Sequence, residues 1–486
     1  MYSMQKFASF LCLLLGIGIF LVGSLAAQTI GSALTVSINV YPDSVLNDVS
    51  SHPVGINLDF LTDDDRYLNP KRKLVDALKA MGVKYLRYPG GNKSDFYFFS
   101  KPPYTKSEPT LARTGKGALG GREAMMKNNY TQFKFDVLDF DEFMSICKEI
   151  GAEPVIVVAG DEYNIDYPPG TTFSSRAQLI ENASAWVKYA NITKKYGVKY
   201  WLIGNETWNI YIKNGAAVYA EDVVAFSKAM KAVDPTISIV PNGNTDEWWQ
   251  TLLPITRGYI DAVCVSNYPI NTCDTVKSLL RPAEIAAQAI RKYGSAAEQS
   301  RLKVIVAEYG PFSWCKNGGD TFVNTTANNL VNLQIAFQQL EQPSIAFSCF
   351  WNTRWIDDGG GKFNGFDALD KNGYFNANGY GMMIVGKFLA DNMIRTRSSG
   401  MLKSYASLSK DKRRLFLYVI NPTLNPVRYT PVMGRYKLIG ISQAYELAGT
   451  GPNDQKPTWQ ALKLASVTQA QMVRGSSVNV IEYRLR

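Results

Sequence analysis

Two glutamates, Glu206 and Glu308, each stand at the end of an apolar run, formed by residues 200–204 and 304–307. A carboxylate at the end of a buried strand is costly unless it is solvated in a cleft or paired. Two carboxyl groups about 5–5.5 Å apart, one protonated and one ionised, can cleave a glycosidic bond by double displacement. We therefore interpret Glu206 and Glu308 as a candidate pair for this chemistry.

The chain of 486 residues contains one histidine, His52. This count excludes a zinc site built on several imidazoles, and carboxylates remain as the common general bases for hydrolysis. A metal-dependent hydrolase is disfavoured by the shortage of ligands. We expect no metal and no cofactor in the site.

The elements that must position the two glutamates are eight apolar runs that alternate with amphipathic stretches between residues 54 and 394. This alternation predicts a (β/α)8 TIM barrel. An open doubly wound sheet is the alternative, but no Gly-x-Gly-x-x-Gly motif follows the first strand. Strands are expected at 54–60, 83–88, 154–159, 200–204, 237–241, 260–266, 304–307 and 345–351, and helices at 71–81, 139–150, 177–196, 220–233, 283–293 and 327–340.

Catalytic groups of such a barrel lie at the carboxyl ends of its strands. The predicted strand ends therefore supply the candidate site. They place Arg87, Asn205, Glu206, Asn267, Tyr268, Glu308 and Trp351 at one face, with Trp208 two residues beyond Glu206.

The two termini are expected to differ from the barrel. Residues 1–27 have the charged, apolar and small-residue regions of a secretory signal peptide, which predicts a secreted or periplasmic protein without stable membrane insertion after cleavage; an uncleaved anchor is the alternative. Residues 395–486 contain short alternating segments, typical of an antiparallel β-sandwich. Residues 28–53 are expected to add one strand to it, because residues 34–41 alternate in the same way.

The formal net charge of +10 comes from basic residues that are scattered along the chain. Because there is no basic run with interleaved aromatic residues, we expect no nucleic-acid partner, whereas an anionic polysaccharide remains open. Cys273 and Cys315 stand in predicted loops and could form a disulfide in an oxidising compartment. Cys147, Cys264 and Cys349 are expected to be buried thiols.

Several stretches of the sequence resemble glycoside hydrolase family 51, the α-L-arabinofuranosidases. The similar segments are YLRYPGG at 85–91, FDEF at 140–143 with EIGAEP at 149–154, AWVKYAN at 185–191 and GVKYWLIGNE at 197–206. The resemblance in motifs is concentrated between residues 54 and 210. It implies a retaining (β/α)8 glycosidase with a C-terminal β-sandwich.

The resemblance also implies roles for individual residues. Glu206 matches the general acid/base and Glu308 the nucleophile. Asn205 would bind the sugar hydroxyl next to the anomeric carbon, Tyr268 would orient Glu308, and Arg87 would help to hold Glu308 ionised. Trp351 matches the aromatic residue that floors the sugar subsite, and Asn267 and Trp208 are further candidates for contact with substrate.

The sequence departs from the family pattern at Asn267, where the family usually has a histidine, in the loop that contains Asp161 and Glu162, and after Glu308. The leading expectation is an α-L-arabinofuranosidase acting on a polysaccharide or oligosaccharide. The alternatives are an endo-acting glycanase on β-glucan or an agar-type galactan, and a catalytically silent carbohydrate-binding barrel. The sequence does not indicate an oligomeric state.

Overall fold

The computed structural model describes residues 35–60, 62–97, 99, 138–160, 175–209, 215–269, 278–310, 324–354, 367–464, 466–467 and 469–486. The predicted signal peptide, the predicted Cys273–Cys315 disulfide and the acids Asp161 and Glu162 therefore lie outside the described residues. None of the helices in these ranges is long and apolar enough to cross a membrane.

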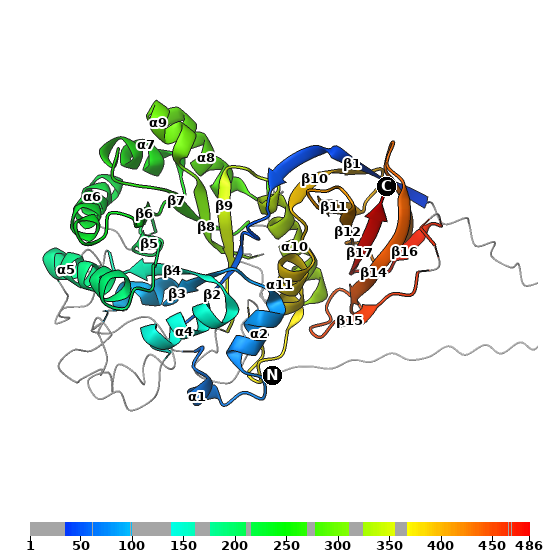
Figure 1. Cartoon of the computed structure of the whole chain (residues 1–486), viewed down its shortest axis with the longest axis horizontal. Helices are drawn as coiled ribbons and strands as arrows, with labels where there is room; N and C mark the ends of the chain where they lie inside the picture. The colour runs from blue at the N-terminus through cyan, green and yellow to red at the C-terminus, as the bar shows by residue number, and fades with distance from the viewer. Residues whose placement is uncertain are drawn as a thin grey trace, which may run out of the picture. The chain divides into compact units, whose positions relative to one another are not determined.

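Eight parallel strands form the predicted barrel, in the order β6-β5-β4-β3-β2-β9-β8-β7 (Figure 1). The end strands β6 and β7 are joined by one isolated bridge, between Asn242 and Cys264. The barrel is therefore nearly closed, but β6 and β7 do not form a continuous hydrogen-bonded pair. The fold class expected from the sequence is confirmed. The barrel strands are β2 (Val54–Asn57), β3 (Tyr85–Tyr88), β4 (Glu153–Val158), β5 (Tyr200–Ile203), β6 (Ser238–Pro241), β7 (Val263–Asn267), β8 (Val304–Tyr309) and β9 (Ile345–Phe350).

Side chains alternate between the inside and the outside of the barrel, as the twofold period of a strand requires. In β4, Val155 and Val157 belong to the cluster inside the barrel, whereas Ile156 and Val158 pack in the large core that includes the helices. The predicted thiols Cys147, Cys264 and Cys349 are all buried and free.

Local sequence signals set the helix boundaries. In α4 (Phe140–Ile150), Asp139 accepts from the Glu142 backbone N–H, and the Glu142 side chain accepts from the Asp139 backbone N–H, which forms a capping box. The helix ends at Gly151, whose φ of +67° suits glycine. The other helices are α1 (Asp65–Leu68), α2 (Leu74–Met81), the 3₁₀ helix η1 (Gly91–Phe96), α5 (Arg176–Val187), the π-helical η3 (Lys188–Thr193), α6 (Gly215–Val233), α7 (Asp246–Ile255), α8 (Arg281–Tyr293), α9 (Ala296–Arg301), α10 (Thr326–Leu340) and α11 (Ala377–Lys387).

The C-terminal region forms one continuous nine-stranded sheet around its own apolar core, with the order β15-β14-β17-β12-β11-β10-β1-β13-β16. The N-terminal strand joins this sheet as expected, but it pairs antiparallel with β10 and parallel with β13. The sheet therefore contains one parallel pair that the alternating pattern did not predict. Its strands are β1 (Thr35–Asp48), β10 (Asn392–Ser398), β11 (Lys403–Leu408), β12 (Arg414–Asn421), β13 (Val427–Val432), β14 (Leu438–Ala448), β15 (Thr458–Ala461), β16 (Gln471–Val473) and β17 (Ser477–Leu485).

Helix α10 packs directly against this sheet. The Phe337 ring lies 4.9 Å from the Tyr405 ring and 4.3 Å from the Tyr418 ring, measured between centroids. Because these rings belong to the same apolar cluster as the barrel helices, barrel and sheet share a core. β10 begins at Asn392, so the sheet starts within the segment that was expected to end the barrel.

Candidate active site

Glu308 lies near the end of β8, where its carboxylate is buried and held at both oxygens. Its Oε1 atom accepts from Arg87 Nη1 at 2.8 Å, and its Oε2 atom accepts from the Tyr268 hydroxyl at 2.7 Å. The register of β8 against β9 shifts between Val306 and Tyr309, and such irregularities redirect side chains next to active sites. Charge-assisted bonds offset the cost of burying this carboxylate, and they fix its orientation.

Arg87 links three strand ends. It lies inside the barrel two positions after Tyr85 on β3, and only 2% of its surface is exposed. Besides Glu308, its guanidinium donates to Asn57 Oδ1 at 2.7 Å and to Asn205 Oδ1 at 2.6 Å. The planar fork of arginine suits several fixed acceptors at once, so Arg87 holds the ends of β2, β5 and β8 in one arrangement.

Glu206 follows β5 and has a φ of +49°, which residues other than glycine rarely adopt. Burial, followed by the charge of the nearby Glu308 carboxylate, raises the pKa of its carboxyl to about 7, although hydrogen bonds to Ser266 and Asn209 and the charge of Arg87 act in the opposite direction. Near neutral pH a substantial fraction of Glu206 is therefore protonated. This is the state that a general acid needs.

Asn205 is fixed from three directions. In addition to its bond with Arg87, its Nδ2 donates to Asn92 Oδ1 at 2.9 Å, and its backbone N–H donates to Asp95 Oδ1 at 3.0 Å. Asn92 and Asp95 both belong to η1, the 3₁₀ helix that follows β3. The helix thereby holds the residue immediately before Glu206.

Trp351 lies against η1 at the end of β9. A Cβ atom on Gly91 would lie 2.3 Å from the Trp351 ring, so only glycine allows the ring to approach the backbone this closely. The ring is 7% exposed. Trp351 therefore lies next to the helix that positions Asn205, and its place in a sugar subsite stays a prediction.

Two predicted residues lie apart from this network. Asn267 is fully buried, and its Nδ2 donates to the Leu279 backbone carbonyl at 2.9 Å, which is a structural contact with the segment after β7. Trp208 is partly exposed, and its buried Nε1 has no hydrogen-bond partner among the described residues. These hydrogen bonds bring together Arg87, Asn205, Tyr268 and Glu308, and the effect of the Glu308 charge on the pKa of Glu206 shows that Glu206 lies nearby.

Sequence reasoning missed four polar residues that support the site: Asn57, Asn92, Asp95 and Ser266. Asn57 had a signal, since a polar residue at the end of a buried strand needs partners; its Nδ2 donates to the Ala307 carbonyl at 2.9 Å. Among the described residues, no cluster of three or more histidine, cysteine, aspartate or glutamate side chains could hold a metal ion.

Comparisons with known proteins show which families this chain is similar to. Residues 77–269 match the family model of the alpha-L-arabinofuranosidase 1 domain. A probable alpha-L-arabinofuranosidase C of Aspergillus terreus is 26% identical over 209 residues, which cover 38% of this chain and 36% of the relative. An intracellular exo-alpha-(1->5)-L-arabinofuranosidase of Acetivibrio thermocellus is 24% identical over 260 residues, covering 50% of this chain and 47% of the relative.

The α-L-arabinofuranosidase structure from Thermotoga maritima superposes with a TM-score of 0.67 at 19% identity and covers 93% of this chain and 100% of that chain. The chain is family 51-like. A family 44 xyloglucanase of Paenibacillus polymyxa also superposes, with a TM-score of 0.62 at 13% identity, covering 93% of this chain and 100% of that one, so the fold alone does not select one sugar. This family 51-like chain spans about a third of the length of the first Aspergillus relatives.

Proposed function

We propose that this chain is a retaining glycoside hydrolase and that its substrates are α-L-arabinofuranosides of a polysaccharide or oligosaccharide. The observation that carries the proposal is the contrast between two neighbouring carboxyl groups. Glu308 is bound by Arg87 and Tyr268, whereas the pKa of Glu206 is raised to about 7 by burial and by Glu308. This is the division into nucleophile and acid that double displacement requires.

In the first step of the proposed mechanism, a Glu308 oxygen attacks the anomeric carbon. Glu206 gives its proton to the glycosidic oxygen of the leaving group, and a covalent glycosyl-enzyme forms. In the second step, Glu206 accepts a proton from water, the water oxygen attacks the anomeric carbon, and Glu308 leaves as a carboxylate. Asn205 is fixed by Arg87 and Asn92, and we assign it the sugar hydroxyl next to the anomeric carbon.

The choice of arabinofuranose rests on the family model and the curated relatives, which are described as arabinofuranosidases.

We also propose that the chain is secreted, on the basis of the signal-like residues 1–27. The N-terminal sequence of exported protein would test this second proposal, since an intact Met1 after export would contradict cleavage.

The substrate is tested with a panel of nitrophenyl glycosides beside digests of arabinan, β-glucan and agar. Release of free arabinose from arabinan and preference for the α-L-arabinofuranoside support the proposal. Release of oligosaccharides without arabinose would replace it by endo-acting hydrolysis. Binding of arabinan without turnover of any substrate would replace it by a silent carbohydrate-binding barrel.

A further inference from the structure

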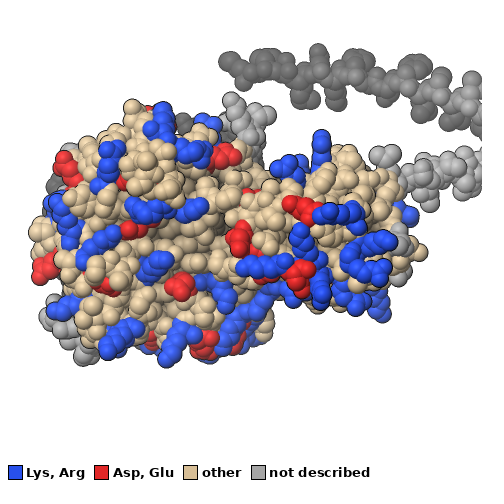
Figure 2. All heavy atoms as spheres, turned by 45° about the horizontal axis from the view of Figure 1, so that its top comes forward, with Lys and Arg blue, Asp and Glu red and all other residues tan. Residues whose placement is uncertain are grey.

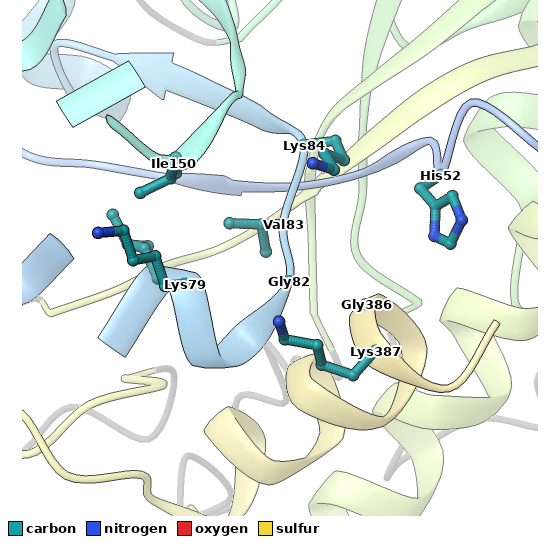
Figure 3. A pocket seen from close by; sticks show the side chains of 9 residues that line it. His52, Lys79, Gly82, Val83, Lys84, Ile150, Gly386 and Lys387 are labelled. Carbon is teal, nitrogen blue, oxygen red and sulfur yellow. The ribbon is translucent and has the colours of Figure 1, made fainter. Parts of the chain in front are cut away.

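A cavity of about 520 Å³ lies at the end of the barrel opposite to Glu308. We call it the basal pocket; its lining includes His52, Lys79, Val83, Lys84, Ile150 and Lys387 (Figure 3). His52 lies two residues before β2, and Lys84 directly precedes β3, so both lie at the amino ends of the strands. The candidate active site uses the carboxyl ends.

Two backbones touch at the floor of the basal pocket. A Cβ atom on Gly82, at the end of α2, would lie 2.7 Å from the Gly386 carbonyl oxygen, and one on Gly386, near the end of α11, would lie 2.1 Å from the Met81 carbonyl oxygen. Any larger residue at either position would push the two helix ends apart. The hollow is therefore built into the packing of α2 against α11.

The charge of the basal pocket is positive and largely uncompensated. Lys79 pairs with Glu149 at 2.7 Å, but Lys84 and Lys387 form no ion pair within the described part of the chain. Burial and the charge of Lys84 lower the pKa of His52, while Asp391 opposes this, so the imidazole is neutral near pH 7. On the face shown in Figure 2, by contrast, basic residues are interspersed with acidic ones. Two unpaired ammonium groups that line one hollow attract an anion.

The other lining groups suit a sugar better than a bare ion. The half-buried Ile150 offers an apolar contact for the C–H groups of a sugar ring, and a neutral imidazole can donate to or accept from a hydroxyl. The volume falls within the range of about 300–1,000 Å³ that small-ligand pockets occupy.

We propose that the basal pocket binds an acidic sugar residue, and that Lys84 and Lys387 supply the positive charge that attracts the carboxylate of a uronic acid. The choice of a sugar acid over another anion rests on the proposed glycosidase function. The pocket would hold the chain to an acidic region of a polysaccharide while the opposite end of the barrel cleaves neutral branches. It is thus a second glycan site, separate from the site of Glu206 and Glu308.

Calorimetric titration of the full chain with trigalacturonate, galactotriose and inorganic sulfate tests this proposal. Of the three ligands, we expect only trigalacturonate to bind. The double variant Lys84→Ala/Lys387→Ala should weaken the binding of trigalacturonate at least tenfold. Hydrolysis of nitrophenyl α-L-arabinofuranoside should stay within twofold of the wild type. Lys387→Ala alone, which removes an exposed side chain, should show part of the loss even if the double variant folds poorly.

The matched control is Lys403→Ala/Lys463→Ala, which removes two exposed charges from the C-terminal region and should leave binding unchanged. Equal loss in this control would mean unspecific charge attraction and would overturn the site. Galactotriose or sulfate binding as tightly as trigalacturonate would also overturn it, as would full binding by Lys84→Ala/Lys387→Ala. Glu308→Gln should bind trigalacturonate normally, so loss of hydrolysis is distinguishable from loss of this site.

Discussion

The ends of β5 and β8 present the same residue type in two opposite environments. Glu308, on β8, accepts hydrogen bonds from a guanidinium and a phenol. Glu206, after β5, has neutral donors in Ser266 and Asn209, and burial together with the charge of Glu308 raises its pKa to about 7. The comparison teaches that the neighbours of a carboxyl group, and not its position at the rim, decide whether it serves as an ion or as an acid.

The largest effect is expected at Glu308. Glu308→Gln removes the nucleophile and should lower kcat by at least about 10⁴-fold, as removal of a covalent nucleophile does in other hydrolases. Rates on nitrophenyl α-L-arabinofuranoside and a melting curve measure this. Wild-type turnover by a folded Glu308→Gln protein would show that another residue is the nucleophile.

The loss of activity in Glu206→Gln should be smaller than in Glu308→Gln, and its size should depend on the leaving group of the substrate. Loss of a general acid costs about 10²- to 10⁴-fold on natural linkages. A nitrophenolate leaves without a proton, so its release should be less affected than that of arabinose from arabino-oligosaccharides. Equal losses on both substrates would contradict the role of Glu206 as acid and weaken the contrast with Glu308.

Tyr268→Phe removes one of the two hydrogen bonds to Glu308 and keeps the ring. A hydrogen bond to a charged group contributes about 1.5–3 kcal/mol, so kcat should fall by roughly 10- to 100-fold. The control is Tyr309→Phe, because the Tyr309 hydroxyl contacts the Met382 sulfur and not Glu308. If both variants lose the same activity, the effect is one of packing and not of the carboxylate.

The pH dependence should show the raised pKa of Glu206 directly. An acid must be protonated to act, so kcat/KM should decline above pH 7, approaching tenfold per pH unit. Initial rates between pH 5 and 9, with stability checked at each pH, measure this limb. In Glu206→Gln the limb should disappear; its persistence would assign it to another group.

The smallest effect is expected from Ser266→Ala. The hydrogen bond from Ser266 lowers the pKa of Glu206, so its loss should move the declining limb to higher pH by less than about one unit. The same pH profiles measure the shift. Movement to lower pH would show that Ser266 stabilises the protonated form of Glu206 instead.

Much of the barrel could be predicted because its strands are short, apolar and regularly spaced. All eight expected strands form, although β7 begins at Val263 rather than at residue 260. The C-terminal sheet was less predictable. β10 contains Arg395 and Arg397, which point away from the core, and only a few apolar residues. Without knowledge of its neighbours β1 and β11, such a segment looks like a linker in the sequence.

The candidate site also has a part that could be predicted from the sequence and a part that could not. Glu206, Glu308 and Arg87 stand at strand ends and belong to recognisable motifs, so their positions in the barrel could be predicted from the sequence. The bonds of Arg87 to Asn57 and Asn205 join positions 30 and 118 residues away, and no local pattern encodes such pairs. Asn267 shows that the end of a strand does not by itself fix the contacts of a side chain, because its Nδ2 donates to the Leu279 backbone carbonyl; its contact with substrate stays a prediction.

The pairing of β1 has a consequence for how this chain folds as it is made. β1 is among the first described residues to leave the ribosome, yet its partners β10 and β13 follow only after the whole barrel. At about 5–20 residues per second, this strand waits for tens of seconds with its edges unpaired. An alternating apolar strand in that state is prone to pair with other chains. We therefore expect nascent chains truncated before residue 392 to need a chaperone to remain dispersed.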